Sequence, residues 1–358
     1  MEKIILKKFK NFDFIERAST INFFKKLFLQ IPNQITFLYG PKSCGKTTLL
    51  NYVREKILSD KNFKNKITFF WYDMREEAFT SYKDLLNLLF PVAKDSNSNL
   101  KLFNISLSER EKLNLKQIEP YQIINQRIEQ EIKKKRKVVI IFDEIQLLKG
   151  IWTEEKKEFL YELINYFIKQ TKVEHKVNVI FVTSDAYFLT ELFQKGKLEA
   201  SAQFVFLDFL NENEINYWLS KYKFKNEEID YLKQKINGNP WLISQVIQYK
   251  KLKENWKAFV ENYIETTKTK IITAINKIEN EDLKKRVILF LKELTVKNGE
   301  LKIGIRSFEK DVLEFLIENE IIFFDPQNGK IKIQLRSMLE TLKKIFNEYK
   351  ASEELFID

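Results

Sequence analysis

The feature that most constrains the fold is an apolar stretch that runs directly into a glycine-rich loop. Residues 35–39, ITFLY, are apolar at nearly every position, which is typical of a strand buried on both faces of a parallel sheet. Residues 40–47, GPKSCGKT, then match the pattern G-x-x-x-x-G-K-[ST] at every fixed position, and a helical pattern follows. This order predicts backbone N–H groups curled around a phosphate at a helix N-terminus.

Two residues of this loop have predicted contacts with the phosphates and their metal. Lys46 is expected to reach the β- and γ-phosphates, and Thr47 to bind Mg²⁺. Cys44, the one cysteine, has two interpretations: a thiol activated by the helix N-terminus, or a small side chain packed beside the loop. We favour the second, because buried cysteines are common. A glycine turn with a coincidental Lys-Thr pair is the alternative to the whole motif.

A second apolar strand pattern, KVVIIFD, ends in a pair of carboxylates, Asp143 and Glu144. In phosphate-loop enzymes an acidic residue at the end of a neighbouring strand completes the metal site, and Asp143 fits that position. Glu144 is placed to polarise a water molecule for attack on the γ-phosphorus. The alternative is an ordinary acidic helix start.

Further strand patterns complete a predicted five-stranded parallel sheet. Residues 176–185, KVNVIFVTSD, end in Thr183 and Ser184, whose hydroxyls are candidates for contact with the γ-phosphate or the attacking water. Residues 67–73 and 204–207 supply two more strands, and helical segments separate all five. No N/T-K-x-D stretch for guanine recognition follows, so ATP is the expected nucleotide.

The amino-acid composition indicates where the protein is located more clearly than it indicates which reaction the protein catalyses. The 358 residues contain 31 Phe and are 44% hydrophobic, enough for several cores, yet no apolar run approaches the ~20 residues that cross a bilayer. The first residues show no signal-peptide pattern, and the lone cysteine agrees with a reducing compartment, so we expect a cytoplasmic protein. The net charge of +11 is weak support for a polyanionic partner.

With these motifs in place, the sequence resembles the archaeal-type ATPases of the STAND group, which are related to AAA+ proteins. The resemblance covers nearly the whole chain. FDFIER at 12–17 is similar to the family's opening motif, and WYDMREEAFTSYKDLL at 71–86 to its second strand with an acidic-x-Arg ending. FLDFLNENEINYWL at 206–219 and INGNPWLIS at 236–244 resemble the start of the helical lid and its G-x-P signature.

The resemblance implies roles for residues outside the loop. It implies that Arg17 lies near the base or ribose, that Gly238 and Pro240 close over the adenine, and that Ser184 acts as a sensor. A turn followed by a helix start is the alternative reading of Gly238-Asn-Pro240. The predicted catalytic residues are Glu144, Lys46 and Ser184, and the predicted metal ligands are Thr47 and Asp143. The predicted nucleotide contacts are Gly40, Pro41, Lys42, Ser43, Cys44, Gly45, Lys46, Thr47, Thr48, Arg17 and Pro240.

Two departures from the family pattern predict slow hydrolysis. Members often carry Gly-Arg before the fifth strand, where this chain offers only Lys195 and Lys197. Related initiator-type proteins place an arginine in the lid, and residues 238–241, GNPW, contain none. An arginine finger is worth about 10³ to 10⁵ in rate, so a slow switch is expected rather than a fast motor.

The C-terminal third predicts a winged-helix module, with two helices followed by a hairpin at residues 321–335. Its second helix carries five acidic residues and one lysine between 308 and 320, which phosphates would repel. A basic wing, with Arg306, Lys330, Lys332 and Arg336, leaves DNA contact open, but we favour a protein partner. The run KKKRK at 133–137 is read as a solvated helix end.

The predicted organisation is therefore an α/β P-loop NTPase domain of AAA+/STAND type with a five-stranded parallel sheet (residues 1–210), a helical lid and connector (211–279) and a winged-helix domain (280–358). The leading hypothesis is a slow, Mg²⁺-dependent ATPase switch that cycles between ATP and ADP. The alternatives are an initiator-like DNA-remodelling ATPase, and a scaffold that holds ADP or ATP without hydrolysis. No membrane association is expected.

Overall fold

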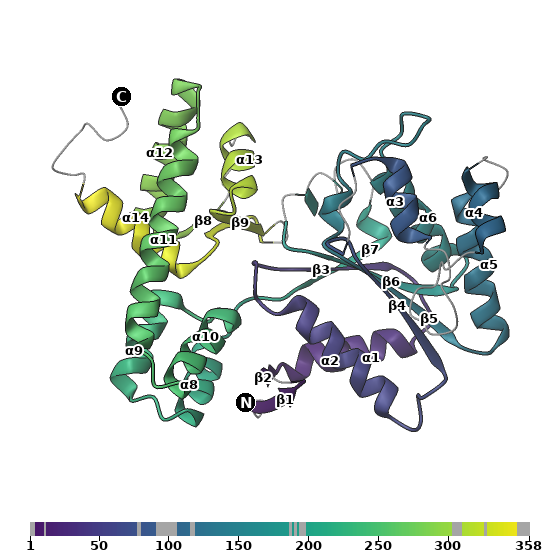
Figure 1. Cartoon of the computed structure of the whole chain (residues 1–358), viewed down its shortest axis with the longest axis horizontal. Coiled ribbons are helices and arrows are strands. Elements are labelled where there is room, and N and C mark those ends of the chain that lie inside the picture. Colours follow the sequence, from purple (N-terminus) through teal and green to yellow (C-terminus); the bar gives the residue numbers. More distant parts are fainter. Residues whose placement is uncertain are drawn as a thin grey trace.

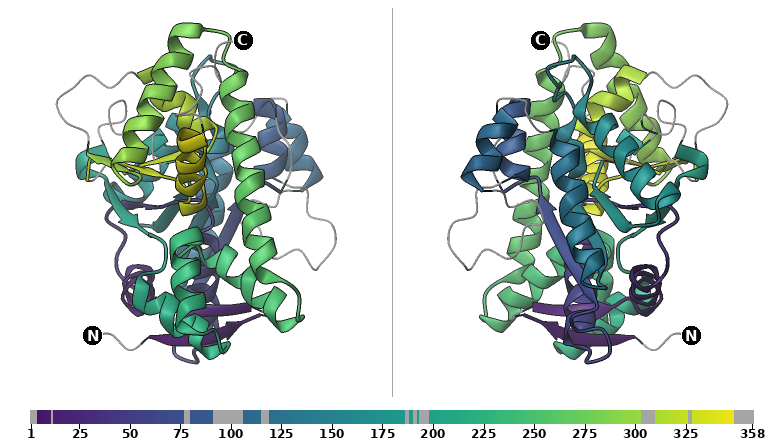
Figure 2. Two further views of the ribbon diagram at one scale, coloured as in Figure 1. Left: turned by 90° about the vertical axis from the view of Figure 1, so that its left-hand side faces the viewer. Right: turned by 90° about the vertical axis from the view of Figure 1, so that its right-hand side faces the viewer.

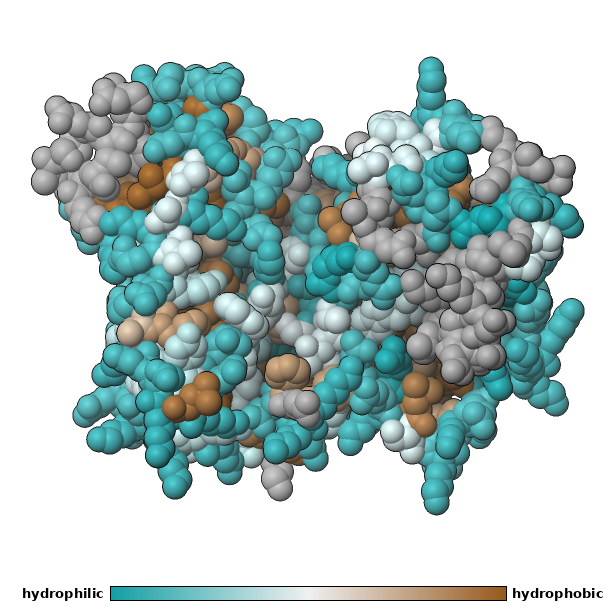
Figure 3. Space-filling view, in the orientation of Figure 1, coloured by the Kyte–Doolittle hydropathy of each residue, from teal (hydrophilic) through white to brown (hydrophobic). Residues whose placement is uncertain are grey.

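The computed structural model describes residues 4–348, apart from residue 11 and the segments 77–79, 91–105, 115–118, 186–187, 190–191, 193–197, 303–309 and 326–327. A large α/β part lies beside a helical and C-terminal part (Figure 1). The face shown in Figure 3 is covered mainly by hydrophilic side chains, with hydrophobic ones in small separate patches. Among the described helices, none combines the length and the apolar character that a membrane crossing needs.

The α/β part is built on the five-stranded parallel sheet that the sequence predicts. Its strand order is β4-β5-β6-β3-β7, so strand β3, which precedes the glycine-rich loop, lies near one edge between β6 and β7. The central strands β5 and β6 are buried at nearly every position, as a parallel sheet covered on both faces requires. The strands are β3 (Ile35–Tyr39), β4 (Ile67–Asp73), β5 (Lys137–Asp143), β6 (Val177–Thr183) and β7 (Ala202–Phe206).

Helices cover both faces of this sheet (Figure 1). One hydrophobic cluster joins the sheet to α3, α5 and α6, and a second joins the opposite face to α1 and α2. The helices are α1 (Ala18–Leu29), α2 (Lys46–Ser59), α3 (Tyr82–Leu89), α4 (Leu107–Asn114), α5 (Pro120–Lys133) and α6 (Phe159–Ile168), with short turns at Ile145–Leu148, Lys169–Val173 and Leu198–Ala200. The chain therefore forms a three-layer α/β sandwich.

A small antiparallel hairpin, β1 (Ile5–Phe9) with β2 (Phe12–Glu16), precedes α1 and is absent from the sequence prediction. Its aromatic side chains Phe9 and Phe14 pack against Tyr52 of α2, with ring centroids 5.6 and 4.9 Å away. Ile15 instead joins the hydrophobic cluster of the helical part. The hairpin thus lies between the two parts of the molecule, near helices α8 to α10 (Figure 2).

The helical part follows β7 and contains α8 (Glu212–Lys221), α9 (Asn226–Ile236), α10 (Pro240–Lys251) and α11 (Trp256–Asn276). Asn211 and Glu214 form a capping box at the start of α8, and Asn239 caps α10 by accepting from the N–H of Leu242. Gly238 packs directly on Leu210, whose N–H donates to the Gly238 carbonyl at 2.9 Å. A Cβ on Gly238 would lie 1.9 Å from the Leu210 carbonyl oxygen, so glycine is required there for close packing.

The C-terminal part contains the predicted helices and hairpin, together with β8 and a final helix that the sequence did not predict. Its strands form a three-stranded antiparallel sheet in the order β8-β10-β9. The predicted basic residue Arg306 lies outside the described residues. The elements are α12 (Glu281–Val296), β8 (Glu300–Lys302), α13 (Lys310–Glu318), β9 (Ile322–Asp325), β10 (Lys330–Ile333) and α14 (Arg336–Glu348).

Strand β9 joins the C-terminal part to the large sheet. Phe323 belongs to the hydrophobic cluster of the sheet, where its ring lies 5.8 Å from that of Phe206 and 6.5 Å from that of Tyr39. The hydroxyl of Tyr39 donates a buried hydrogen bond of 3.0 Å to Asp325 Oδ1. Tyr39 ends the strand that leads into the glycine-rich loop, so the C-terminal part is anchored next to that loop.

Candidate functional site

The glycine-rich loop connects β3 to the N-terminus of α2, as predicted. Gly45 has φ +98°, a left-handed conformation that glycine adopts without strain. Gly40 needs the absence of a side chain for a different reason, because a Cβ there would lie 2.0 Å from the carbonyl oxygen of Leu207. The two glycines thus allow the loop to curl between the ends of β3 and β7 and to open onto the first turn of α2.

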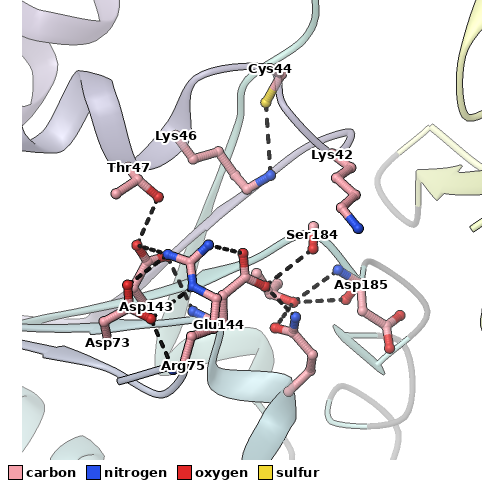
Figure 4. A network of polar contacts seen from close by, with 12 residues as sticks. Lys42, Cys44, Lys46, Thr47, Asp73, Arg75, Asp143, Glu144, Ser184 and Asp185 are labelled. Atoms are coloured by element: carbon pink, nitrogen blue, oxygen red, sulfur yellow. Dashed lines mark hydrogen bonds and ion pairs between the residues drawn. The ribbon is translucent and has the colours of Figure 1, made fainter. Parts of the chain in front are cut away.

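Lys46 is buried and turned back onto its own loop. Its Nζ donates to the carbonyl oxygens of Gly40 at 2.9 Å and Pro41 at 3.0 Å. It also lies 3.8 Å from Cys44 Sγ (Figure 4). Only 6% of Lys46 is exposed, so its charge is held by these carbonyl groups and not by solvent. Cys44 is itself buried among the residues of the sheet and α2, which agrees with the packing interpretation.

Thr47 and Asp143 meet at the ends of two different segments. Thr47 Oγ1 donates a 2.7 Å hydrogen bond to Asp143 Oδ2. The Asp143 carboxyl group is fully buried, and desolvation raises its pKa to about 6, although the Thr47 hydrogen bond acts in the opposite direction. The hydroxyl and the carboxylate are hard oxygen ligands of the kind that Mg²⁺ prefers.

Glu144 follows at the turn after β5, with φ 57° and ψ 46°. Its carboxylate is engaged on both oxygens. Oε2 accepts from Ser184 Oγ at 3.2 Å and from Gln146 Nε2, and Oε1 lies 3.5 Å from Arg75 Nη1. Gln146 in turn accepts from Thr183 Oγ1 at 2.7 Å, so the hydroxyl groups at the end of β6 support Glu144 directly and through Gln146 (Figure 4).

Arg75 is a site residue to which sequence reasoning gave no role. It follows β4, and its guanidinium group binds both carboxylate oxygens of Asp73, at 2.8 and 2.7 Å, and reaches Asp143 Oδ2 at 3.4 Å. The signal was present in the acidic-x-Arg pattern of residues 73–75. A pattern of three residues along the chain, however, does not say which distant carboxylates an arginine will meet.

A cavity of about 500 Å³ brings these residues together with the helical part. Arg17, Ser184 and Pro240, which the family resemblance placed near the nucleotide, all line it. So do the loop residues from Lys42 to Thr48 and the carboxylate-bearing Glu144. Gly40, Pro41 and Asp143 are not part of the lining, but each accepts a hydrogen bond from a lining residue, Lys46 or Thr47. The cavity is large enough for a nucleotide, with the phosphate loop in one wall.

The hairpin, the segment after β7 and the helical part contribute apolar side chains to the cavity lining, among them Phe14, Leu207, Leu210 and Trp218. Arg17 also lines the cavity. Its Nη1 donates to the carbonyl oxygen of Asp208, while Nη2 is buried and has no partner within the described part of the chain. A buried unpaired donor in a cavity wall is a group that a bound ligand can satisfy.

Lys42 differs from the other loop residues in its interaction partner. It lines the cavity, yet its Nζ pairs with Glu320, which follows α13 in the C-terminal part. Lys270 of α11 binds the other oxygen of Glu320 at 3.2 Å. The tip of the phosphate loop is therefore in contact with the C-terminal part, a relationship that the sequence did not predict.

No self-contained metal site is present in the described part of the chain: no group of three or more His, Cys, Asp or Glu side chains there is arranged to hold an ion. A cation at Thr47 and Asp143 would therefore need further oxygen ligands, such as those of phosphate groups or water. The predicted positions Lys195 and Lys197 lie outside the described residues.

Comparison with known proteins finds related ATPase domains and ATP-binding proteins. A profile of ATPase domains found predominantly in Archaea matches residues 14–246. An ATP-binding protein of Methanocaldococcus jannaschii is 31% identical over 334 residues, covering 89% of this chain and 90% of that protein. A second from the same organism is 32% identical over 332 residues, covering 89% and 95% respectively.

Two solved structures share the fold. The Walker-type ATPase of Pyrococcus abyssi superposes with a TM-score of 0.61 at 14% identity, over 92% of this chain and 95% of that one. The ORC2 protein of Aeropyrum pernix, solved in complexes with ADPNP and ADP, gives a TM-score of 0.50 at 13% identity, over 94% and 95%. Since the profile and the two relatives span most of its length, the chain belongs to the family of ATPase domains found predominantly in Archaea.

Proposed function

We propose that the chain binds Mg²⁺·ATP in the 500 Å³ cavity, hydrolyses it slowly to ADP and phosphate, and uses the nucleotide state to control its C-terminal part. The observation that carries the proposal is that Lys46, Thr47 and Glu144 line one cavity, while Asp143 accepts a hydrogen bond from Thr47. Phosphate binding, metal binding and water activation each have a group there.

Each group has a defined task in this proposal. Lys46 leaves the carbonyl groups of its loop and donates to the β- and γ-phosphates. Thr47 and Asp143 would hold Mg²⁺, which supplies neutralisation of the charge that develops on the phosphates. Arg17 and Pro240 lie where they can contact the base or the ribose.

Glu144 is the proposed general base, which accepts a proton from the attacking water. Its carboxylate is oriented by Ser184 and Gln146, so these residues set the direction in which its free lone pairs point. Oε2 already accepts two hydrogen bonds, whereas Oε1 has only the Arg75 contact and keeps a lone pair that can accept the proton. The absence from the sequence of the arginines discussed above supports a slow rate.

We propose that the nucleotide state controls how firmly the C-terminal part is attached to the α/β part. We interpret this C-terminal part as a winged-helix module. It is anchored through Asp325 on Tyr39, directly before the phosphate loop, and through Glu320 on Lys42, within that loop. A phosphate that draws Lys42 toward the nucleotide would compete with Glu320 for the same ammonium group. Nucleotide binding would thereby weaken one anchor and free the module for a protein partner.

DNA binding through the wing is the second candidate, and the structure favours it less. Lys332 pairs with Asp208 at 3.4 Å and Lys330 with Glu300 at 2.6 Å, so these cations are already engaged. The acidic character of α13 adds repulsion from phosphates. The third candidate is a scaffold that holds ADP or ATP as a structural cofactor and does not hydrolyse it.

The test is steady-state ATP hydrolysis by the purified chain with Mg²⁺, with and without duplex DNA at low salt, using Glu144→Gln as the blank. A slow rate above the blank that DNA leaves unchanged supports the switch. A rate that DNA raises severalfold supports the second candidate. Tight nucleotide binding with no rate above the blank supports the scaffold, and no nucleotide binding at all refutes the proposed function.

A further inference from the structure

Three carboxylates converge at the carboxyl ends of two neighbouring strands. Asp73 and Asp143 are paired in register at the ends of β4 and β5, and Glu144 is the next residue. Negative charges this close repel one another, and the repulsion is larger where solvent is excluded, as it is at the buried Asp143. A cation placed among these carboxylates stabilises their charged forms.

Arg75 supplies that cation. Its Nε and Nη2 atoms bind the two oxygens of Asp73 in a bidentate pair, and its backbone N–H donates to Asp73 Oδ1 at 2.9 Å. The same guanidinium lies 3.4 Å from Asp143 Oδ2 and 3.5 Å from Glu144 Oε1 (Figure 4). One side chain therefore contacts all three carboxylates.

Arg75 and Thr47 approach the same oxygen of Asp143. Asp143 Oδ2 also accepts the hydrogen bond from Thr47, and these two groups are the proposed Mg²⁺ ligands. Arg75 thus lies on the side of Asp143 that faces the phosphate loop. Half of its side chain is exposed, and the residue lines the nucleotide cavity, so it can move without disturbing the core.

We propose that Arg75 is a positioning residue whose guanidinium group competes with Mg²⁺ for the carboxylate of Asp143. Mg²⁺·ATP must then displace Arg75 in order to bind. Because Arg75 also contacts Glu144 Oε1, displacement frees that oxygen at the same moment. Binding of Mg²⁺ and release of Glu144, the proposed general base, from Arg75 then occur together. The inference rests on the proposed function, since it assumes that Mg²⁺ and a nucleotide share this cavity.

The test measures how Mg²⁺ affects nucleotide binding without turnover. A fluorescent, non-hydrolysable ATP analogue is titrated into wild type, Arg75→Gln and Arg75→Lys, first with EDTA and then over a range of Mg²⁺ concentrations. Arg127→Gln is the matched control, because Arg127 also pairs with a carboxylate, Glu109, but does not line the nucleotide cavity. Circular dichroism and thermal unfolding confirm that each variant is folded.

If Arg75 competes with Mg²⁺, Arg75→Gln reaches half-maximal Mg²⁺ effect at a concentration on the order of tenfold lower than wild type, since one competing charge has been removed. Arg75→Lys falls between them, because a single ammonium group cannot bridge the three carboxylates in the same way. Arg127→Gln behaves as wild type. The metal-free, nucleotide-free Arg75→Gln protein also unfolds at a lower temperature than wild type.

A Mg²⁺ requirement that is unchanged or increased in Arg75→Gln overturns the inference, because Arg75 would then be indifferent to the metal or would support it. The proposed function fails separately, if wild type does not bind the analogue at any Mg²⁺ concentration. Should Arg75→Gln be unfolded, the Arg75→Lys titration decides alone: a Mg²⁺ requirement equal to wild type refutes the displacement.

Discussion

Thr47 Oγ1 and Asp143 Oδ2 lie 2.7 Å apart although the two residues are separated by 96 positions in the sequence. The contact joins the first turn of α2 to the end of β5 across the carboxyl edge of the sheet. Because Asp143 is buried, the hydrogen bond offsets only part of the cost of keeping its charge away from water. The buried charge of Asp143 therefore lowers the stability of the fold, although the same charge suits the residue to bind a metal ion.

We therefore predict that Asp143→Asn raises the free energy of unfolding of the chain, when it is measured in the absence of nucleotide and metal. The pKa of Asp143 is raised from 3.8 to about 6 by desolvation, so the unfolded chain releases this proton more readily than the folded one. The free energy of unfolding of wild type therefore falls as pH rises from about 4 to 6. Above pH 6 the loss caused by ionised Asp143 is complete, at most about 3 kcal/mol. Asp143→Asn carries no ionisable group at this position and does not have this loss.

Urea unfolding at two pH values checks this prediction. Asp143→Asn is expected to be more stable than wild type at pH 8, and the difference is expected to shrink toward zero at pH 4. A variant that is less stable than wild type at pH 8 would show that the contacts of the Asp143 carboxylate outweigh its desolvation.

Lys46→Ala is predicted to weaken ATP binding by about 10²-fold while leaving the fold intact. The lysine contributes charge-assisted hydrogen bonds to phosphate, and its present partners are carbonyl groups of its own loop, which water can serve in its place. Equilibrium binding of a fluorescent ATP analogue measures the change. Lys56→Ala, at the far end of the same helix and outside the cavity, is the control that should bind normally.

Gly238→Ala is predicted to disrupt the packing of the helical part on the end of β7. The added Cβ would lie 1.9 Å from the Leu210 carbonyl oxygen, a backbone atom that cannot turn aside. We expect a loss of more than 2 kcal/mol in the free energy of unfolding, together with weaker nucleotide binding. Gly150→Ala is the control, because a Cβ there meets open space and costs only the strain of a φ of +79°, about 1 kcal/mol.

Tyr39→Phe is predicted to loosen the C-terminal part from the sheet. It removes the donor to the buried Asp325, and a buried carboxylate that loses a partner costs about 1–3 kcal/mol. Hydrogen exchange of the β9–β10 peptides should become faster in the variant. Tyr52→Phe, which loses a hydrogen bond to Glu16 far from β9, should leave those peptides unchanged; equal exchange in both variants would refute the anchor.

The sequence predicted the elements whose signals are local. The phosphate loop is a contiguous pattern and the buried strands are continuous apolar runs, so both are recognised from short windows. The parallel arrangement follows from the alternation of these strands with helical segments. Asp143 and Glu144 were assigned to the site because phosphate-loop enzymes carry an acidic residue at the end of a neighbouring strand. In the structure, Glu144 lines the cavity and Asp143 accepts a hydrogen bond from Thr47 of the loop.

The features that were missed depend on contacts between distant segments. Hairpin β1–β2 is stabilised by Tyr52 of α2 and by the helical part, neither of which is visible in its own alternating sequence. Arg75 could have paired with any nearby acid, and only the register of β4 with β5 selects Asp143 and Glu144. The anchoring of Phe323 in the sheet likewise follows from three-dimensional packing, not from the apolar character of β9.

The most direct test of the account is a single-turnover measurement on the fate of bound ATP. Excess protein with Mg²⁺ is mixed with labelled ATP, and the bound nucleotide is identified over time in wild type and Glu144→Gln. The account predicts that wild type converts bound ATP to ADP over minutes while Glu144→Gln retains ATP with similar affinity. Conversion at the same rate in both proteins, or in neither, would contradict the assignment of Glu144 as the base in a hydrolysing site.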